Sequence, residues 1–148
     1  MASGLAWSMT TAVDTNVIVA LWDRDPGLCA AAESALDAAL GRGSLITTAA
    51  VFAELMAAPG RSESFLDSFF RETGIHIDWA LDEPVWRLAG RAFQSYAARR
   101  RKQREAGPRR ILADFLIGAH ASEGGHSLLT LEVHLYRTAF PNLTVIGV

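Results

Sequence analysis

The chain has 148 residues and a mass of 16.0 kDa, which is the size of one domain with a hydrophobic core of its own. Half of the residues are hydrophobic and a fifth are charged, which excludes a disordered chain. Cys29 is the only cysteine, so an internal disulfide and a cysteine-based zinc site are excluded, while the net charge of −2 neither favours nor excludes a nucleic-acid partner.

Residues 1–8 are interpreted as an N-terminal extension or an expression remnant, and residues 9–148 as a single domain. The opening MASGLAWS lacks the basic region and the long apolar run of a secretory signal. No apolar stretch approaches the roughly 18 residues that a membrane span needs. Together with the lone cysteine, these features favour a soluble, cytoplasmic protein with no membrane association.

Short apolar runs predict strands over residues 11–14, 45–47, 75–78, 127–130 and 143–146. Segments with helical spacing predict helices over residues 17–22, 30–40, 48–58, 62–73, 84–104 and 109–122. We expect Thr15 or Asn16 to cap the first helix, and Asp25-Pro26-Gly27 to separate it from the second. Strands that alternate with helices predict an α/β fold, a three-layer α/β/α sandwich with a mainly parallel central sheet.

Asp14 closes the first predicted strand, which is otherwise apolar. The carboxyl ends of parallel strands are where ligand crevices form, so this carboxylate is a candidate ligand. Aspartate is also among the best helix N-cap residues. Taken alone, Asp14 is open to both interpretations.

Glu54 and Asp114 each stand inside an apolar helical segment. Glu54 is the one residue of Ala49–Ala58 that is not hydrophobic, and Asp114 lies in Ile111-Leu112-Ala113-Asp114-Phe115-Leu116, with Gly118 one turn later leaving room beside it. A solvent-facing acid is the alternative at each position. Buried carboxylates are unfavourable unless they are paired or bind a metal ion, so convergence with Asp14 on a divalent cation explains all three. An all-oxygen ligand set favours magnesium or manganese, one or two ions, over zinc.

The order and spacing of four short motifs resemble the PIN-domain nucleases, and within them the VapC-type toxins of toxin–antitoxin pairs. These motifs are Val13-Asp14-Thr15-Asn16-Val17, Ala53-Glu54-Leu55, Ala113-Asp114-Phe115-Leu116-Ile117 and Leu129-Thr130-Leu131-Glu132 ahead of Tyr136. The resemblance runs from about Thr11 to the C-terminus. It implies a metal-dependent endoribonuclease that cleaves RNA with metal-activated water and leaves a 5′-phosphate and a 3′-hydroxyl.

The resemblance also assigns roles to individual residues. The family carboxylates, catalytic and metal-binding, correspond to Asp14, Glu54, Asp114 and Glu132, and the small polar residues that orient them correspond to Thr15, Asn16 and Thr130. The fourth acid is usually aspartate in the family, so Glu132 is a departure, and an exposed loop residue is its alternative. A homodimer that binds a small cognate antitoxin is also implied.

A basic segment between residues 99 and 110 carries seven of the fourteen basic residues and one acid, which leaves seven basic and fifteen acidic residues elsewhere. Its cations are Arg99, Arg100, Arg101, Lys102, Arg104, Arg109 and Arg110. Such density favours contact with RNA phosphates or with an antitoxin. A solvated helix end that complements the helix dipole is the alternative.

Two other functions compete with a nuclease. An aspartyl phosphatase also begins with a strand that ends in Asp, but it needs a second aspartate where Asn16 stands, and a lysine other than Lys102. A catalytically weak PIN-like module that binds RNA or a partner is favoured only by Glu132. The four histidines, His76, His120, His126 and His134, share no ligand spacing, and we expect them to be structural or exposed.

Overall fold

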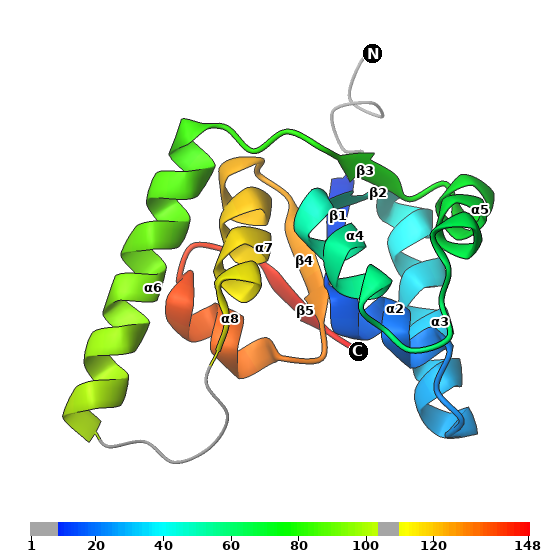
Figure 1. Ribbon diagram of the computed structural model, residues 1–148, viewed down its shortest axis with the longest axis horizontal. Coiled ribbons are helices and arrows are strands. Elements are labelled where there is room, and N and C mark those ends of the chain that lie inside the picture. The colour runs from blue at the N-terminus through cyan, green and yellow to red at the C-terminus, as the bar shows by residue number, and fades with distance from the viewer. Residues whose placement is uncertain (1–8, 104–109) are drawn as a thin grey trace.

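The computed structural model describes residues 9–103 and 110–148. Its strands form a five-stranded sheet in the order β3-β2-β1-β4-β5 (Figure 1). The strands are β1 (Met9–Val13), β2 (Gly43–Thr48), β3 (His76–Asp78), β4 (Ser127–Thr130) and β5 (Val145–Gly147). Each pair of neighbouring strands is parallel, which confirms the predicted parallel sheet.

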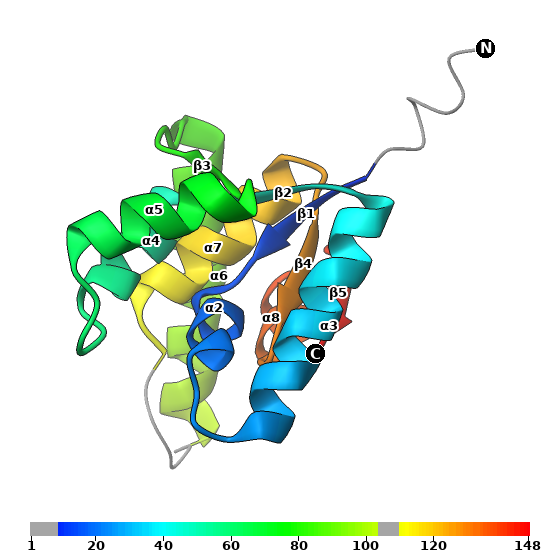
Figure 2. The same cartoon turned by 90° about the vertical axis from the view of Figure 1, so that its right-hand side faces the viewer.

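Helices cover both faces of this sheet, as the α/β/α prediction requires. They are α2 (Thr15–Leu21), α3 (Pro26–Arg42), α4 (Ala49–Met56), α5 (Glu63–Thr73), α6 (Glu83–Gln103), α7 (Leu112–Glu123) and α8 (Val133–Ala139). Figure 2 shows α3 on one face and α4, α5 and α7 on the other. Helix α6 packs against the outer side of α7. No helix within residues 9–103 and 110–148 is long and apolar enough to cross a membrane.

The core lies between the central strands and α7. Val13, Leu129 and Phe115 are almost fully buried, and every residue of α7 from Phe115 to Ala121 is buried. We expected Gly118 to leave room beside Asp114, but the ring of Phe140 fills that space. A Cβ at Gly118 would come within 2.2 Å of this ring, so the glycine allows Phe140 to pack on α7.

The predicted starts of two helices are wrong. Asp14, not Thr15 or Asn16, is the N-cap of α2, because its side chain accepts from the Thr15 backbone N–H. Helix α3 begins at Pro26 rather than at residue 30. Asp25 caps it, and proline suits the first turn because its fixed φ is helical and its missing N–H is not needed there.

The short helix α8 was not predicted from the sequence. It has seven residues, too few for a periodic pattern, and its fully buried Tyr136 anchors it to the core. Helix α6 extends to Gln103, and the predicted positions of residues 104 and 109 lie outside the described residues, as do residues 1–8. Helix α7 begins at Leu112, so its predicted start at residue 109 is also wrong, because residues 110 and 111 are not helical.

Candidate active site at the carboxyl edge of the sheet

Parallel pairing brings the predicted acids to one edge of the sheet. Strand β1 ends directly before Asp14, and the neighbouring strand β4 ends at Thr130. The Asp14 backbone N–H donates to the Leu129 carbonyl at 3.0 Å, which extends the ladder into the site. The segments that carry Glu54 and Asp114 follow the same edge, because α4 starts directly after β2 and α7 packs across β2 and β4.

Asp14 is 4% exposed and both of its carboxylate oxygens are held. Oδ1 accepts from the Thr15 backbone N–H at 2.8 Å, and Oδ2 accepts from the Thr130 hydroxyl at 2.7 Å. Burial, with a smaller contribution from the negative charge of Asp114, raises the pKa of Asp14 to about 6 against the lowering effect of its hydrogen bonds. Ionisation of Asp14 is therefore less favourable than ionisation of an aspartate in water.

Glu54 lies on α4, and its Oε1 accepts from the Thr15 hydroxyl at 2.7 Å. The side chain is half-buried rather than fully solvent-facing. Burial raises the pKa of Glu54, and the charge of Asp114 adds to this shift. Thr15 thus binds both Asp14 and Glu54.

Asp114 lies in the first turn of α7, where its Oδ2 accepts from the Ile111 backbone N–H at 3.2 Å. The residue is a helix cap and a member of the acidic cluster at once. Its pKa is raised by burial, then lowered by the Ile111 N–H and by Arg110, and raised again by the charge of Glu132. Asp114 therefore lies between the other three acids electrostatically, since its charge raises the pKa values of Asp14 and Glu54 and the charge of Glu132 raises its own.

Glu132 is the most exposed of the four. Its backbone N–H donates to the Thr130 hydroxyl oxygen at 2.9 Å, and its Oε2 lies 3.4 Å from Nη2 of Arg110. The side chain is 47% exposed. The structure thus brings Glu132 to the rim of the cluster, where it pairs with a cation from the basic segment.

The three small polar residues predicted around the acids all form hydrogen bonds at this edge. Thr15 and Thr130 contact the acids directly. The Asn16 side-chain oxygen accepts from the Leu131 backbone N–H at 3.2 Å and so ties α2 to the turn before α8. Asn16 therefore supports the segment that carries Glu132.

Tyr136 is a site residue that the sequence analysis did not identify as one. Its side chain is fully buried, and its hydroxyl lies close enough to Asp14 to lower the pKa of that carboxyl. Burial and the charges of Asp14, Asp114 and Glu54 raise the pKa of Tyr136 well above its usual value. Within the described chain this hydroxyl has no hydrogen bond of normal length. The available signal was its position one helical turn after Glu132.

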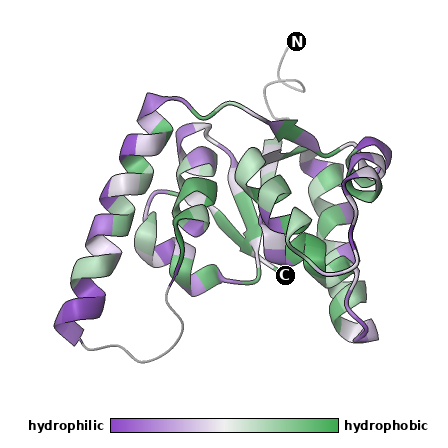
Figure 3. Ribbon diagram, viewed as in Figure 1, coloured by the Kyte–Doolittle hydropathy of each residue, from purple (hydrophilic) through white to green (hydrophobic). Residues whose placement is uncertain are grey.

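The basic segment is only partly joined to the acids. Arg99, Arg100, Arg101 and Lys102 occupy the last turns of α6, which Figure 3 shows as strongly hydrophilic. The Tyr96 hydroxyl accepts from the Arg110 backbone N–H at 2.8 Å, and the Arg110 side chain forms an ion pair with Glu132. Arg99 and Arg110 also line a cavity of about 150 Å³ with His134. Arg104 and Arg109 lie outside the described residues.

The donor chemistry of this edge fits a hard divalent cation. Burial raises the pKa values of Asp14, Glu54 and Asp114, and repulsion by a neighbouring carboxylate adds to each shift. A cation among them would reverse both effects. Carboxylate oxygens are the ligands that magnesium and manganese prefer. As they stand, however, no three Asp, Glu, His or Cys side chains in residues 9–103 and 110–148 surround a common point. An ion would therefore have to draw the carboxylates together.

Comparisons with known proteins agree with this architecture. A complex of VapBC2 from Rickettsia felis with a promoter DNA fragment has a similar chain, with a TM-score of 0.60, 18% identity and coverage of 94% of this chain and 98% of that one. For VapBC-1 from nontypeable Haemophilus influenzae the TM-score is 0.59 and the identity 22%, with coverage of 94% of this chain and 98% of that one. For a toxin–antitoxin complex from Klebsiella pneumoniae the TM-score is 0.63 and the identity 17%, with coverage of 92% of this chain and 95% of that one. At such identities the likeness shows the fold.

No curated protein matches the chain in sequence. The family described as PIN domain matches residues 11–141, which include Asp14, Glu54, Asp114 and Glu132. That match covers most of the sequence. The chain therefore belongs to the PIN-domain family.

Proposed function

We propose that this protein is a metal-dependent endoribonuclease, the toxin of a VapBC-type toxin–antitoxin pair, with residues 9–148 as its nuclease domain. The observation that carries the proposal is the convergence of three acids at one edge of the sheet, Asp14 directly after β1, Glu54 on α4 and Asp114 on α7. Burial raises the pKa of each, and the charge of Asp114 adds to the shifts of Asp14 and Glu54. Such perturbed, clustered groups are typical of functional sites. The PIN-domain membership and the toxin–antitoxin complexes with the same fold support it.

The cofactor in this proposal is Mg²⁺ or Mn²⁺, held by Asp14, Asp114 and Glu54, with Glu132 at the rim. When bound, one or two such ions lower the pKa of a water and neutralise charge on the scissile phosphate. The products are a 5′-phosphate and a 3′-hydroxyl.

The chain's own residues orient the carboxylates for this task. Thr130 and the Thr15 N–H hold the two oxygens of Asp14, and the Thr15 hydroxyl turns Glu54 toward it. The Ile111 N–H fixes Asp114. Replacing a residue that positions a ligand in this way typically lowers metal affinity or activity by about 10- to 100-fold.

The substrate is RNA in this proposal, and the basic end of α6 attracts its backbone. Arg99, Arg100, Arg101, Lys102 and Arg110, with Arg104 and Arg109 from the segment between, supply the positive charge that the acidic edge lacks. The partners are a second copy of the chain and a small cognate antitoxin, and the protein acts in the cytoplasm.

The test is incubation of total RNA with the purified protein, with and without Mg²⁺ or Mn²⁺, beside Asp14→Asn. Asp67→Asn is a matched control, because Asp67 is an exposed acid on α5. We expect cleavage that needs the metal, disappears in Asp14→Asn and persists in Asp67→Asn. Cleavage that continues undiminished in Asp14→Asn would remove the proposal.

A catalytically weak module that binds RNA or a partner is the second candidate. It is favoured by the Arg110–Glu132 pair at the rim and by the absence of a preformed group of three ligands among the described residues. Wild-type protein that binds RNA or an antitoxin but cleaves no RNA with either metal would support this alternative.

A further inference from the structure

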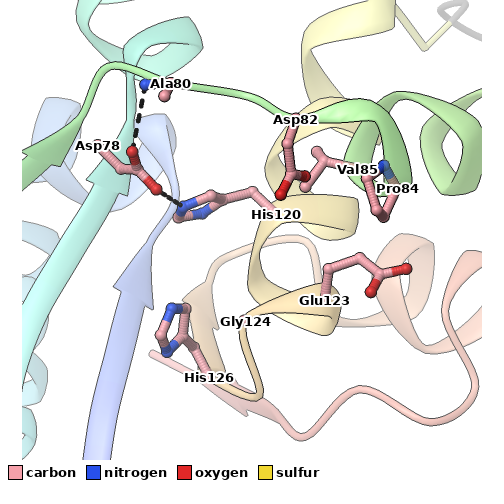
Figure 4. A pocket seen from close by; sticks show the side chains of 9 residues that line it. All are labelled: Asp78, Ala80, Asp82, Pro84, Val85, His120, Glu123, Gly124 and His126. Carbon is pink, nitrogen blue, oxygen red and sulfur yellow. Dashed lines mark hydrogen bonds and ion pairs between the residues drawn. The ribbon is translucent and has the colours of Figure 1, made fainter.

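A second group of histidines and acids lies at the opposite end of α7. Asp114 stands in the first turn of this helix, whereas His120 is in its last turns. Asp78 from the end of β3 and His126 from the turn before β4 meet His120 there. With Asp82 and Glu123, these side chains line a pocket of about 340 Å³ (Figure 4). This pocket is separate from the candidate active site.

His120 is held in one orientation but is only half satisfied. It is 5% exposed, and its Nε2 lies 3.0 Å from Oδ2 of Asp78. An ionised carboxylate only accepts hydrogen bonds, so Nε2 carries a hydrogen, and in the neutral ring Nδ1 then presents a lone pair. Nδ1 is buried and has no hydrogen-bond partner within the described chain. Leaving a buried acceptor unpaired is unfavourable, so this nitrogen is a candidate ligand atom.

His126 supplies a second imidazole beside it. The centroids of the two rings are 5.8 Å apart. Burial and the neighbouring His120 lower the pKa of His126. The ring lies against Gly124, where a Cβ would come within 2.4 Å of Nε2. Figure 4 shows the two imidazoles at one side of the pocket, with Asp82 and Glu123 across from them.

We propose that this pocket binds a transition-metal ion such as Zn²⁺ or Ni²⁺ through Nδ1 of His120 and a ring nitrogen of His126. Asp78 is the positioning carboxylate, because a metal-binding histidine almost always donates its other N–H to such a group. Imidazole nitrogens favour zinc, nickel or copper over magnesium, which distinguishes this site from the all-oxygen edge.

The two histidines are not a complete ligand set. Within residues 9–103 and 110–148, no three His, Cys, Asp or Glu side chains are already arranged around a common metal position. Zinc usually takes at least three protein ligands. Glu123 or Asp82, which line the same pocket, therefore turns toward the ion, and water completes its coordination.

The test is calorimetric titration of the whole chain with Zn²⁺ in excess Mg²⁺, which keeps the carboxylate edge occupied. We expect one Zn²⁺ per chain, and about 10- to 100-fold weaker binding in Asp78→Asn, which keeps an acceptor for His120 but removes the charge. His126→Ala removes a ligand and should weaken binding at least as much. Gly124→Ala keeps both histidines but displaces the His126 ring, and it should also weaken binding.

His134→Ala is the matched control, because this histidine is exposed and lies outside the pocket. It should bind Zn²⁺ as the wild type does. Bound Zn²⁺ should also raise the Tm of the wild type and not that of His126→Ala. Absence of wild-type binding below about 100 µM, or unchanged affinity in both His126→Ala and Gly124→Ala, would overturn the proposal and leave Asp78–His120 as a structural ion pair. Neither result depends on RNA cleavage.

Discussion

The Thr15 hydroxyl donates a 2.7 Å hydrogen bond to Oε1 of Glu54, and so joins the first turn of α2 to α4. The backbone N–H of the same threonine donates to Asp14. Two acids from distant parts of the sequence are therefore positioned by one residue. The arrangement makes Thr15 the most direct test of whether the acids work as a unit.

Replacing Thr15 with alanine should reduce RNA cleavage while the fold is kept. A hydrogen bond to a charged group contributes about 1.5 to 3 kcal/mol, so we expect kcat/KM to fall about ten-fold or more. Thr15→Ser keeps the hydroxyl and should restore most of the activity. Circular dichroism should be unchanged in both variants. Equal loss in Thr15→Ser and Thr15→Ala would mean that the hydroxyl is not the relevant group.

Asp14 should make the metal-free protein less stable as the pH rises. Its pKa is about 6 in the folded chain and 3.8 in the reference state, so between these values the folded chain binds more protons than the unfolded chain. The free energy of unfolding therefore falls with rising pH through this window, and the loss is complete about one pH unit above the folded-state pKa. Its size is about 3 kcal/mol as an order of magnitude.

Denaturant unfolding in EDTA at pH 5 and pH 7.5 measures this effect. The free energy of unfolding of Asp14→Asn should fall less between pH 5 and pH 7.5 than that of the wild type. At pH 7.5 the variant should be at least as stable as the wild type. Added Mg²⁺ should stabilise the wild type at pH 7.5 and not the variant. A variant that is less stable than the wild type at pH 7.5 in EDTA would argue that Asp14 is mainly a helix cap.

Tyr136→Phe should change the pH dependence of cleavage more than its maximum. The hydroxyl lowers the pKa of Asp14, so its removal should raise that pKa further. The acid limb of the pH–rate profile should then move to higher pH. The fold should be kept, since the hydroxyl forms no normal hydrogen bond within the described residues and the aromatic ring remains. An unshifted profile would exclude an electrostatic role for this hydroxyl.

Glu132→Gln should reduce cleavage less than Asp14→Asn does. Glu132 is about half exposed and pairs with Arg110 at 3.4 Å, and exposed ion pairs contribute only about 0 to 1 kcal/mol. Glu132→Asp, which restores the acid that the family resemblance leads us to expect, should keep the activity. Rates measured side by side decide this. Inactivity of Glu132→Gln equal to that of Asp14→Asn would make Glu132 a full ligand.

The double variant Arg101→Ala/Lys102→Ala should weaken RNA binding without changing stability. Both residues are exposed in the last turn of α6. Each lost phosphate contact should reduce the slope of log K against log salt by about 0.7 for single-stranded RNA. Arg71→Ala/Arg87→Ala removes the same charge from other surfaces and should leave the slope unchanged. An equal effect of the two double variants would indicate long-range attraction only.

The local pattern predicted most of the secondary structure, because helical and strand spacing depend on neighbouring residues. Alternating strands and helices were enough to predict the parallel sheet, and the order of Asp14, Glu54 and Asp114 was enough to propose the acidic edge. The pattern failed where tertiary packing decides. Helix α8 is too short to show a period, and Phe140 fills the space beside Gly118 that the sequence analysis left open.

By itself, the sequence determined the identity of the acids and the apolar segments that carry them, since both follow from residue type and spacing. Only the tertiary structure decided which groups meet. The pairing of β1 with β4 brings Thr130 to Asp14, and the turn before α8 brings Glu132 to Arg110. The contact between His120 and Asp78 joins residues 42 positions apart, and no local pattern encodes such a distance. Long-range contacts depend on strand order and helix packing, which the whole chain must fold to establish.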